Sequence, residues 1–257
     1  IENLILNVIN EKEFSEKDVF HLNERWHCFD AHSELSNSNK DLLLKNLNSQ
    51  LHKITETLKE ATHIIITLGT AWVYRHIETD KIVSNCHKIP QKKFLKELLS
   101  ADEVEDSLKA IIALIKSVNP AVQLLFTISP IRHLKDGFTE NSISKAHLRT
   151  AVNQVVDQKK EISYFPSFEI MLDDLRDYRF YSDDMVHPNE TAITYIWEAF
   201  KATWINDTTF PIMQQIDAIR KGLSHRPFNP NSEQHKNFLA QLRNKMNILE
   251  ADFDIQF

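Results

Sequence analysis

Short apolar runs alternate with longer amphipathic segments along most of the chain. The runs 63–68, 122–128 and 162–165 are rich in β-branched and aromatic residues, and each ends at a glycine or shortly before a proline. Continuous apolar runs of this length, bounded by turn residues, are typical of parallel strands that are buried on both faces. The pattern therefore predicts at least three parallel strands.

Amphipathic helices are predicted between and after these strands. In segments 37–60, 101–118, 144–158 and 189–204, apolar residues recur every three or four positions, as on one buried face of a helix. Strands that alternate with helices of this length form βαβ units, in which helices cover both faces of a parallel sheet. The predicted fold class is α/β, a three-layer α/β/α sandwich with a parallel sheet.

Two features interrupt or extend this alternation. Segments 72–75 and 81–83 flank Glu78-Thr79-Asp80 and are predicted to pair as a small antiparallel hairpin. Near the C-terminus, helices are predicted at 210–221 and 232–249. We therefore expect an α/β domain over residues 1–205 and a helical C-terminal extension over residues 206–257.

The charge balance excludes one class of partner. The 257 residues carry a net charge of -6, whereas a nucleic-acid-binding domain usually shows a basic patch or stripe. Two cysteines over this length fit a reducing compartment. Neither an apolar stretch of about 20 residues nor a secretory signal pattern occurs. We expect a cytoplasmic protein without nucleic-acid or membrane partners, and the sequence does not set its oligomeric state.

The beginning of the chain is unusual. It opens at Ile1 within an apolar helical pattern, and the first of its three glycines is Gly69. The strand-to-helix turns of α/β proteins need positive φ angles, which glycine adopts most readily. We expect that a segment upstream of Ile1 is missing from this sequence.

The most specific chemical signal is an aspartate three residues before a histidine, at Asp184 and His187, followed by Pro188 and a predicted helix. This spacing places a carboxylate and an imidazole on the same side of one loop. Proline is favourable in the first turn of the helix that follows. The carboxylate is expected to orient the ring, so that the ring takes a proton from a nucleophilic hydroxyl. The alternative is that Asp184 caps the helix and His187 is an ordinary surface residue.

Other polar residues follow the predicted strands at their carboxyl ends, where open parallel sheets place their sites. Gly69 follows the first strand and would offer its N–H to an oxyanion, while Arg132 and His133 follow the second. Asn85 and His87, after the hairpin, would add side-chain donors. Each residue also has a plain structural explanation, as a turn glycine, a strand stop or a backbone bridge. It is their joint position that predicts an oxyanion and substrate-binding site.

Histidine and cysteine also cluster, at His27, Cys28 and His32 and again at Cys86 and His87. Zinc binds such ligands, but the chain has no Cys-x-x-Cys or His-Glu-x-x-His spacing. We therefore expect no metal ion and no cofactor.

Four segments together resemble one protein family. They are Leu-Gly-Thr-Ala-Trp-Val-Tyr at 68–74, Asn-Cys-His-Lys-Ile-Pro at 85–90, Ser-Pro-Ile-Arg-His at 129–133 and the block 164–188. These segments resemble the GSCFA family, which is similar to the SGNH hydrolases. The resemblance covers roughly residues 1–205 and implies the SGNH/flavodoxin-like form of the sandwich. The Asp-x-x-His pair of SGNH enzymes matches Asp184 and His187.

The chain departs from the family pattern in two places. The Gly-Ser-Cys-Phe-Ala motif for which the family is named, at the position of the SGNH nucleophile serine, does not occur in it. Where most SGNH enzymes have Gly-x-Asn-Asp after a strand, this chain has Gly-Thr-Ala-Trp at 69–72. The resemblance then implies a nucleophile upstream of Ile1, with Asn85 or His87 in place of the missing oxyanion asparagine.

The residues and the resemblance together predict an ester hydrolase or acyl transferase that acts on O-acyl groups of a small molecule or a carbohydrate. In it His187 is the base, Asp184 orients the base, and the glycine N–H with the asparagine side chain forms the oxyanion hole. One alternative is a non-catalytic ligand-binding domain on the same fold. A further alternative is a metal-dependent hydrolase with its metal on His27, His32 and His87.

Overall fold

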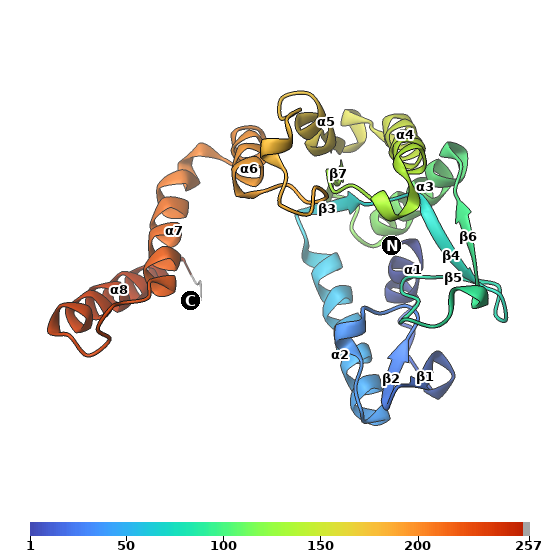
Figure 1. Cartoon of the computed structure of the whole chain (residues 1–257), viewed down its shortest axis with the longest axis horizontal. Helices are drawn as coiled ribbons and strands as arrows, with labels where there is room; N and C mark the ends of the chain where they lie inside the picture. The colour runs from blue at the N-terminus through green and yellow to red at the C-terminus, as the bar shows by residue number, and fades with distance from the viewer. Residues whose placement is uncertain (254–257) are drawn as a thin grey trace. The chain divides into compact units, whose positions relative to one another are not determined.

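The computed structural model of the chain describes residues 1–253. The chain forms two compact units, Ile1–Ile196 and Trp197–Phe257, and the division falls inside helix α6 (Glu190–Trp204). Figure 1 shows the course of the chain through both units. The domain boundary predicted from the sequence, between residues 205 and 206, lies just after the end of this helix. This boundary stays a prediction.

The first unit is built on a parallel sheet of three strands in the order β3-β7-β8. β3 (His63–Leu68), β7 (Gln123–Ile128) and β8 (Ile162–Phe165) are the three strands predicted from the apolar runs. The last residues of β3 and β7 lie opposite each other, and β8 ends opposite Thr127. The carboxyl ends of all three strands therefore meet at one edge.

The first unit also contains the helices α1 (Glu2–Ile9), α2 (Lys40–Glu60), α3 (Ala101–Val118), α4 (Phe138–Val155) and α5 (Ser167–Leu172). In Figure 1, α4 and α5 lie above the sheet, and α1 and α2 lie below it. Both α4 and α5 contact β7, while α3 packs against α1 and α4. Every residue of β7 from Leu124 to Ile128 is buried, which requires cover on both faces because successive side chains point to opposite faces. The three-layer α/β/α sandwich is therefore confirmed.

Strand β3 differs from β7 in its cover. Among the described residues it pairs with β7 alone, and its side chains alternate: Ile66 and Leu68 are buried, whereas Ile65 is 53% exposed. The apolar run predicted the strand correctly. Burial on both faces, however, holds for β7 and not for β3, because the face of β3 that carries His63, Ile65 and Thr67 is exposed.

Two small antiparallel sheets accompany the parallel one. The predicted hairpin forms from β4 (Trp72–His76) and β5 (Lys81–Val83), and β6 (Phe94–Leu98) adds a third strand on the other side of β4. A second hairpin joins β1 (Val19–Leu22) to β2 (Arg25–Cys28). Neither β6 nor this second hairpin was predicted.

Helix α4 begins at Phe138, whereas the apolar spacing predicted a start at residue 144. The preceding Gly137 has a φ of 113°, a left-handed conformation that other residues rarely adopt. The carboxylate of Glu140 lies where a Cβ on residue 137 would be, but this flexible side chain can move aside. The φ angle is therefore what favours glycine at the point where the chain turns into α4.

The second unit is helical, as predicted. Its helices α7 (Phe210–Ser224) and α8 (Glu233–Phe253) pack through the buried side chains of Ile219, Leu242 and Leu249. Among the helices of the described chain, none combines the length and the apolar character needed to cross a membrane.

Candidate active site

The predicted Asp–His pair forms a short closed loop ahead of α6. The ring Nδ1 of His187 lies 2.6 Å from Oδ2 of Asp184. The other carboxylate oxygen accepts the backbone N–H groups of Val186, at 2.9 Å, and of His187, at 3.0 Å. Met185 makes this tight turn possible with a left-handed φ of 59°. The spacing of three residues thus brings carboxylate and imidazole into direct contact.

The hydrogen bonds fix the charge on the carboxylate and the tautomer of the ring. The backbone N–H of His187, its ring and the N–H of Val186 hold the pKa of Asp184 at about 2. An ionised carboxylate only accepts hydrogen bonds, so the ring proton must sit on Nδ1 of His187. No described residue forms a hydrogen bond or an ion pair with Nε2, and the side chain is 55% exposed. The free nitrogen is therefore able to accept a proton from an incoming group.

Arg132 holds this loop against the end of β7. Its backbone N–H donates to the carbonyl of Val186 at 3.2 Å, and its Nη1 donates to the carbonyl of Met185 at 2.9 Å. Because Arg132 follows β7 by only four residues, the Asp184–His187 loop lies at the carboxyl end of the parallel sheet. This is the edge at which the sequence predicted a site.

The next residue, His133, lies against the turn that follows β3. Its Nε2 is 3.6 Å from the place where a Cβ on Gly69 would be. Burial lowers the pKa of His133, which favours the neutral ring. The backbone N–H groups of Gly69 and Thr70 have no acceptor in the described chain. These two N–H groups are available to a ligand oxygen.

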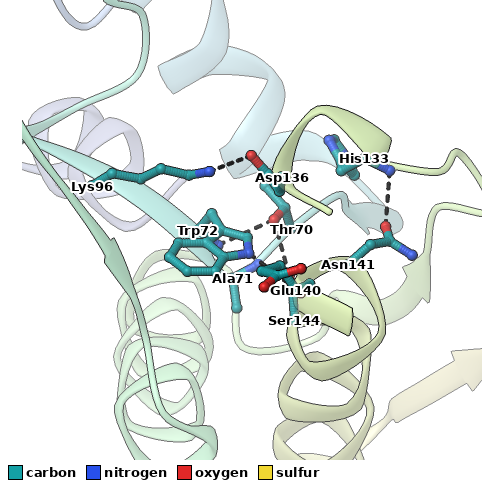
Figure 2. A network of polar contacts seen from close by, with 9 residues as sticks. All are labelled: Thr70, Ala71, Trp72, Lys96, His133, Asp136, Glu140, Asn141 and Ser144. Atoms are coloured by element: carbon teal, nitrogen blue, oxygen red, sulfur yellow. Dashed lines mark hydrogen bonds and ion pairs between the residues drawn. The ribbon is translucent and has the colours of Figure 1, made fainter. Parts of the chain in front are cut away.

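Two consecutive residues of α4, Ser144 and Lys145, hold this turn in place, and Figure 2 shows the contacts of Ser144. The Ser144 hydroxyl accepts the N–H of Ala71 at 2.8 Å and pairs with the hydroxyl of Thr70 at 2.9 Å. Lys145, only 2% exposed, donates to the carbonyls of Gly69 at 2.7 Å and Ser129 at 2.6 Å. Neither role could be predicted from the sequence, since a helical pattern shows which positions face the core but not which polar side chain enters it.

Replacing Ser144 by alanine is expected to lower the free energy of unfolding by about 1–3 kcal/mol, because the buried N–H of Ala71 loses its acceptor. Urea denaturation of the purified protein measures the change. The matched control is Ser142→Ala, which removes an exposed hydroxyl from the same helix and should change stability by less than about 0.5 kcal/mol. Equal stability of the two variants would contradict a structural role of Ser144.

The other two predicted site residues lie in a different environment. The side chain of Asn85 donates to the Ser33 hydroxyl at 3.2 Å and accepts the N–H of His87 at 2.8 Å. The ring of His87 is buried and directs Nδ1 to Ser33, at 3.3 Å, and Nε2 to the carbonyl of Cys28, at 2.7 Å. No contact in the described chain joins these residues to the Asp184–His187 pair. Their role in an oxyanion hole stays a prediction.

Asn85 does border a cleft of about 560 Å³ that is also lined by Lys135 and Asp136. These two residues follow His133 by two and three positions, and Asp136 pairs with Lys96 of β6. The antiparallel sheet is thus joined to the loop that follows β7. Asn85 therefore lies across this cleft from the loop that follows β7, next to the antiparallel sheet.

The histidines of the metal hypothesis lie around the β1–β2 hairpin. The rings of His27 and His87 are 4.8 Å apart, and Nε2 of His27 lies 3.2 Å from the carbonyl of Leu22. Nδ1 of His32 accepts the backbone N–H of Glu34. In the part of the chain that the structure describes, no three His, Cys, Asp or Glu side chains come together as a metal site would require.

Comparison with known proteins identifies two matching family models. The model of the GSCFA family matches residues 1–200, and the model of the C-terminal domain of GSCFA domain proteins matches residues 216–257. No curated protein matches the chain. The first match includes the turn at Gly69, the loop at Arg132 and the Asp184–His187 pair, and it spans well over half of the sequence. The chain belongs to the GSCFA family.

Proposed function

We propose that this GSCFA protein is an SGNH-type ester hydrolase or acyl transferase that acts on O-acyl groups of a small molecule or a carbohydrate. The observation that carries the proposal is the 2.6 Å contact between Asp184 and Nδ1 of His187, which leaves Nε2 free and exposed. An imidazole oriented in this way by an ionised carboxylate is a general base for a hydroxyl nucleophile.

The nucleophile in this proposal is the serine of the family's Gly-Ser-Cys-Phe-Ala motif, upstream of Ile1. Its hydroxyl oxygen attacks the ester carbonyl while Nε2 of His187 takes the hydroxyl proton. The N–H groups of Gly69 and Thr70 hold the resulting oxyanion, since both lack an acceptor in the described chain. The imidazolium then gives its proton to the leaving alcohol, and an acyl-serine remains.

The second half of the reaction repeats the first with a different nucleophile. Water attacks the acyl-serine in a hydrolase, and a second alcohol attacks it in a transferase. In both cases Nε2 of His187 takes the proton and returns it to the serine oxygen as the new acid or ester leaves. Asp184, which keeps its charge above pH of about 2, stabilises the imidazolium in each half.

A fluorophosphonate reagent tests this proposal directly, because it reacts covalently with serines that a neighbouring base activates. The protein to use is the chain extended at its N-terminus by the family's motif segment. We expect one label per molecule, on the serine of the motif, detected by intact mass and peptide mass spectrometry. The extended chain with this serine replaced by alanine is the control and should stay unlabelled.

Absence of labelling in a folded, extended protein would contradict the proposal. It would favour the alternative in which the same fold serves as a non-catalytic ligand-binding domain. Labelling on a different residue, such as Ser129, would instead show that the nucleophile has been assigned wrongly.

A further inference from the structure

A pocket of about 270 Å³ is lined by Arg132, the residue that holds the Asp184–His187 loop. Its polar wall consists of Arg132, Arg176, Asp177, Tyr178 and Tyr181. Met171 and Leu172, at the end of α5, form an apolar wall. Arg132 belongs both to this pocket and to the contacts that hold the His187 loop, so the pocket adjoins the proposed base.

The two arginines of this pocket have no carboxylate partner among the described residues. Arg132 uses Nη1 on the carbonyl of Met185, and its guanidinium lies 5.3 Å from the ring centre of Tyr181 and 5.9 Å from that of Tyr178. Arg176 donates from Nε to the carbonyl of Asp173. The remaining guanidinium N–H groups are therefore available to a ligand.

The one carboxylate of the pocket is already paired. Asp177 accepts the backbone N–H of Arg179 at 2.9 Å, and its other oxygen lies 4.0 Å from Nε of the same arginine. Arg179 does not line the pocket. Burial raises the pKa of Tyr181, which keeps its hydroxyl protonated and able to donate. The pocket thus presents an excess of positive charge and hydrogen-bond donors.

We propose that this pocket binds an anionic group, a carboxylate or a phosphate, that the ester substrate carries a short distance from its acyl carbon. Guanidinium groups bind such anions through charge-assisted and often bidentate hydrogen bonds. The aromatic rings around Arg132 hold its guanidinium in place and exclude water from one side of it. That the anion belongs to an ester substrate rests on the proposed function. The binding of an anion in this pocket does not depend on catalysis.

Binding of small esters to the 257-residue chain tests this inference. The probes are monomethyl succinate, which joins an ester to a carboxylate, methyl phosphate as the phosphate probe, and dimethyl succinate as the neutral counterpart of the first. Chemical-shift titration at low salt gives each dissociation constant. We expect at least one anionic probe to bind about ten-fold or more tightly than dimethyl succinate, a difference of about 1.4 kcal/mol. The tighter of the two anions then identifies the ligand chemistry.

Arg176→Gln is the decisive variant. Arg176 lines the pocket but takes no part in the contacts by which Arg132 holds the His187 loop. We expect it to weaken anion binding by about five-fold or more, since one charge-assisted contact is lost. Arg243→Gln is the control, an exposed arginine on α8 that neither lines the pocket nor pairs with any residue that does. Circular dichroism confirms that both variants are folded.

Equal affinity for the neutral and both anionic probes would overturn the inference. So would an Arg176→Gln variant that binds anions as tightly as Arg243→Gln. Failure of the ester hydrolase proposal looks different, because it appears as absence of fluorophosphonate labelling while selective anion binding persists.

Discussion

Replacing His187 by alanine should lower kcat/KM for a small activated ester by about 10²–10⁴-fold or more in the protein extended by the motif segment. A serine hydroxyl is a weak nucleophile until a base removes its proton. His187 is the only described residue whose ring is oriented by Asp184 while its second nitrogen stays free. The measurement is release of p-nitrophenol from short-chain p-nitrophenyl esters.

Asp184→Asn should reduce the rate less than His187→Ala, because it disturbs the orientation and charge of the base without removing it. The control is His52→Ala, which removes an exposed ring on α2 and should leave the rate unchanged. Unchanged activity in His187→Ala would mean that the base is elsewhere.

The chain without the motif segment should be inactive. Its Ser129 is buried, and the hydroxyl accepts the N–H of Ile131 at 3.3 Å. No described contact joins it to His187. If the 257-residue chain nevertheless hydrolyses esters, Ser129→Ala is the next variant to measure.

The parallel sheet could be predicted from the sequence because its strands are continuous apolar runs that end at turn residues. β3 and β8 begin and end where the runs do, and β7 starts one residue later than predicted. Long helices were equally clear where one face is apolar, as in α3. In these elements the local pattern and the tertiary environment agree.

The antiparallel strands β1, β2 and β6 were not predicted, because their residues are of mixed polarity. β6 reads Phe-Leu-Lys-Glu-Leu and is only partly buried. The β1–β2 hairpin turns at Asn23 and Glu24, which both have positive φ. Two-residue hairpin turns with this backbone conformation usually have glycine at the second position. Without that glycine, Asn23 alone is a weak signal for the turn.

The site divides in the same way. Gly69, Arg132 and His133 follow parallel strands whose carboxyl ends share one edge, so their proximity could be predicted from topology. Asn85 and His87 follow β5, which belongs to the antiparallel sheet, and the same rule does not apply to its end. The contacts of His87 with the β1–β2 region depend on a hairpin that the sequence did not reveal.

Lys145 is the residue whose role depends most on tertiary structure. Its ammonium group is enclosed between two backbone carbonyls and lies 5.6 Å from the ring centre of Phe168, with no carboxylate partner in the described chain. Burial lowers the pKa of this lysine to about 8. Such a group makes the stability of the fold depend on pH in the alkaline range.

The sign of this dependence follows from the two pKa values. Below pH 8 both the folded and the unfolded chain hold the proton, and the cost of burying the charge is fully present. Between about pH 8 and 10.5, the unfolded chain keeps a proton that folded Lys145 has lost, so the stability of the folded state rises with pH. The rise amounts to about 2–3 kcal/mol over this interval. The slope reaches about 1.4 kcal/mol per pH unit midway between the two pKa values and is smaller near each of them.

Lys145→Met removes this term while keeping most of the side-chain volume. The free energy of unfolding of the unmutated protein, minus that of the variant, should therefore increase by about 2–3 kcal/mol between pH 7.5 and 10.5. Urea denaturation at a series of pH values gives this difference, in which the titration of all other groups cancels to a first approximation. Lys53→Met, which removes an exposed lysine from α2, is the control and should show no such increase. A difference that stays constant with pH would mean that Lys145 keeps its proton through this range, with the carbonyls of Gly69 and Ser129 compensating for its burial.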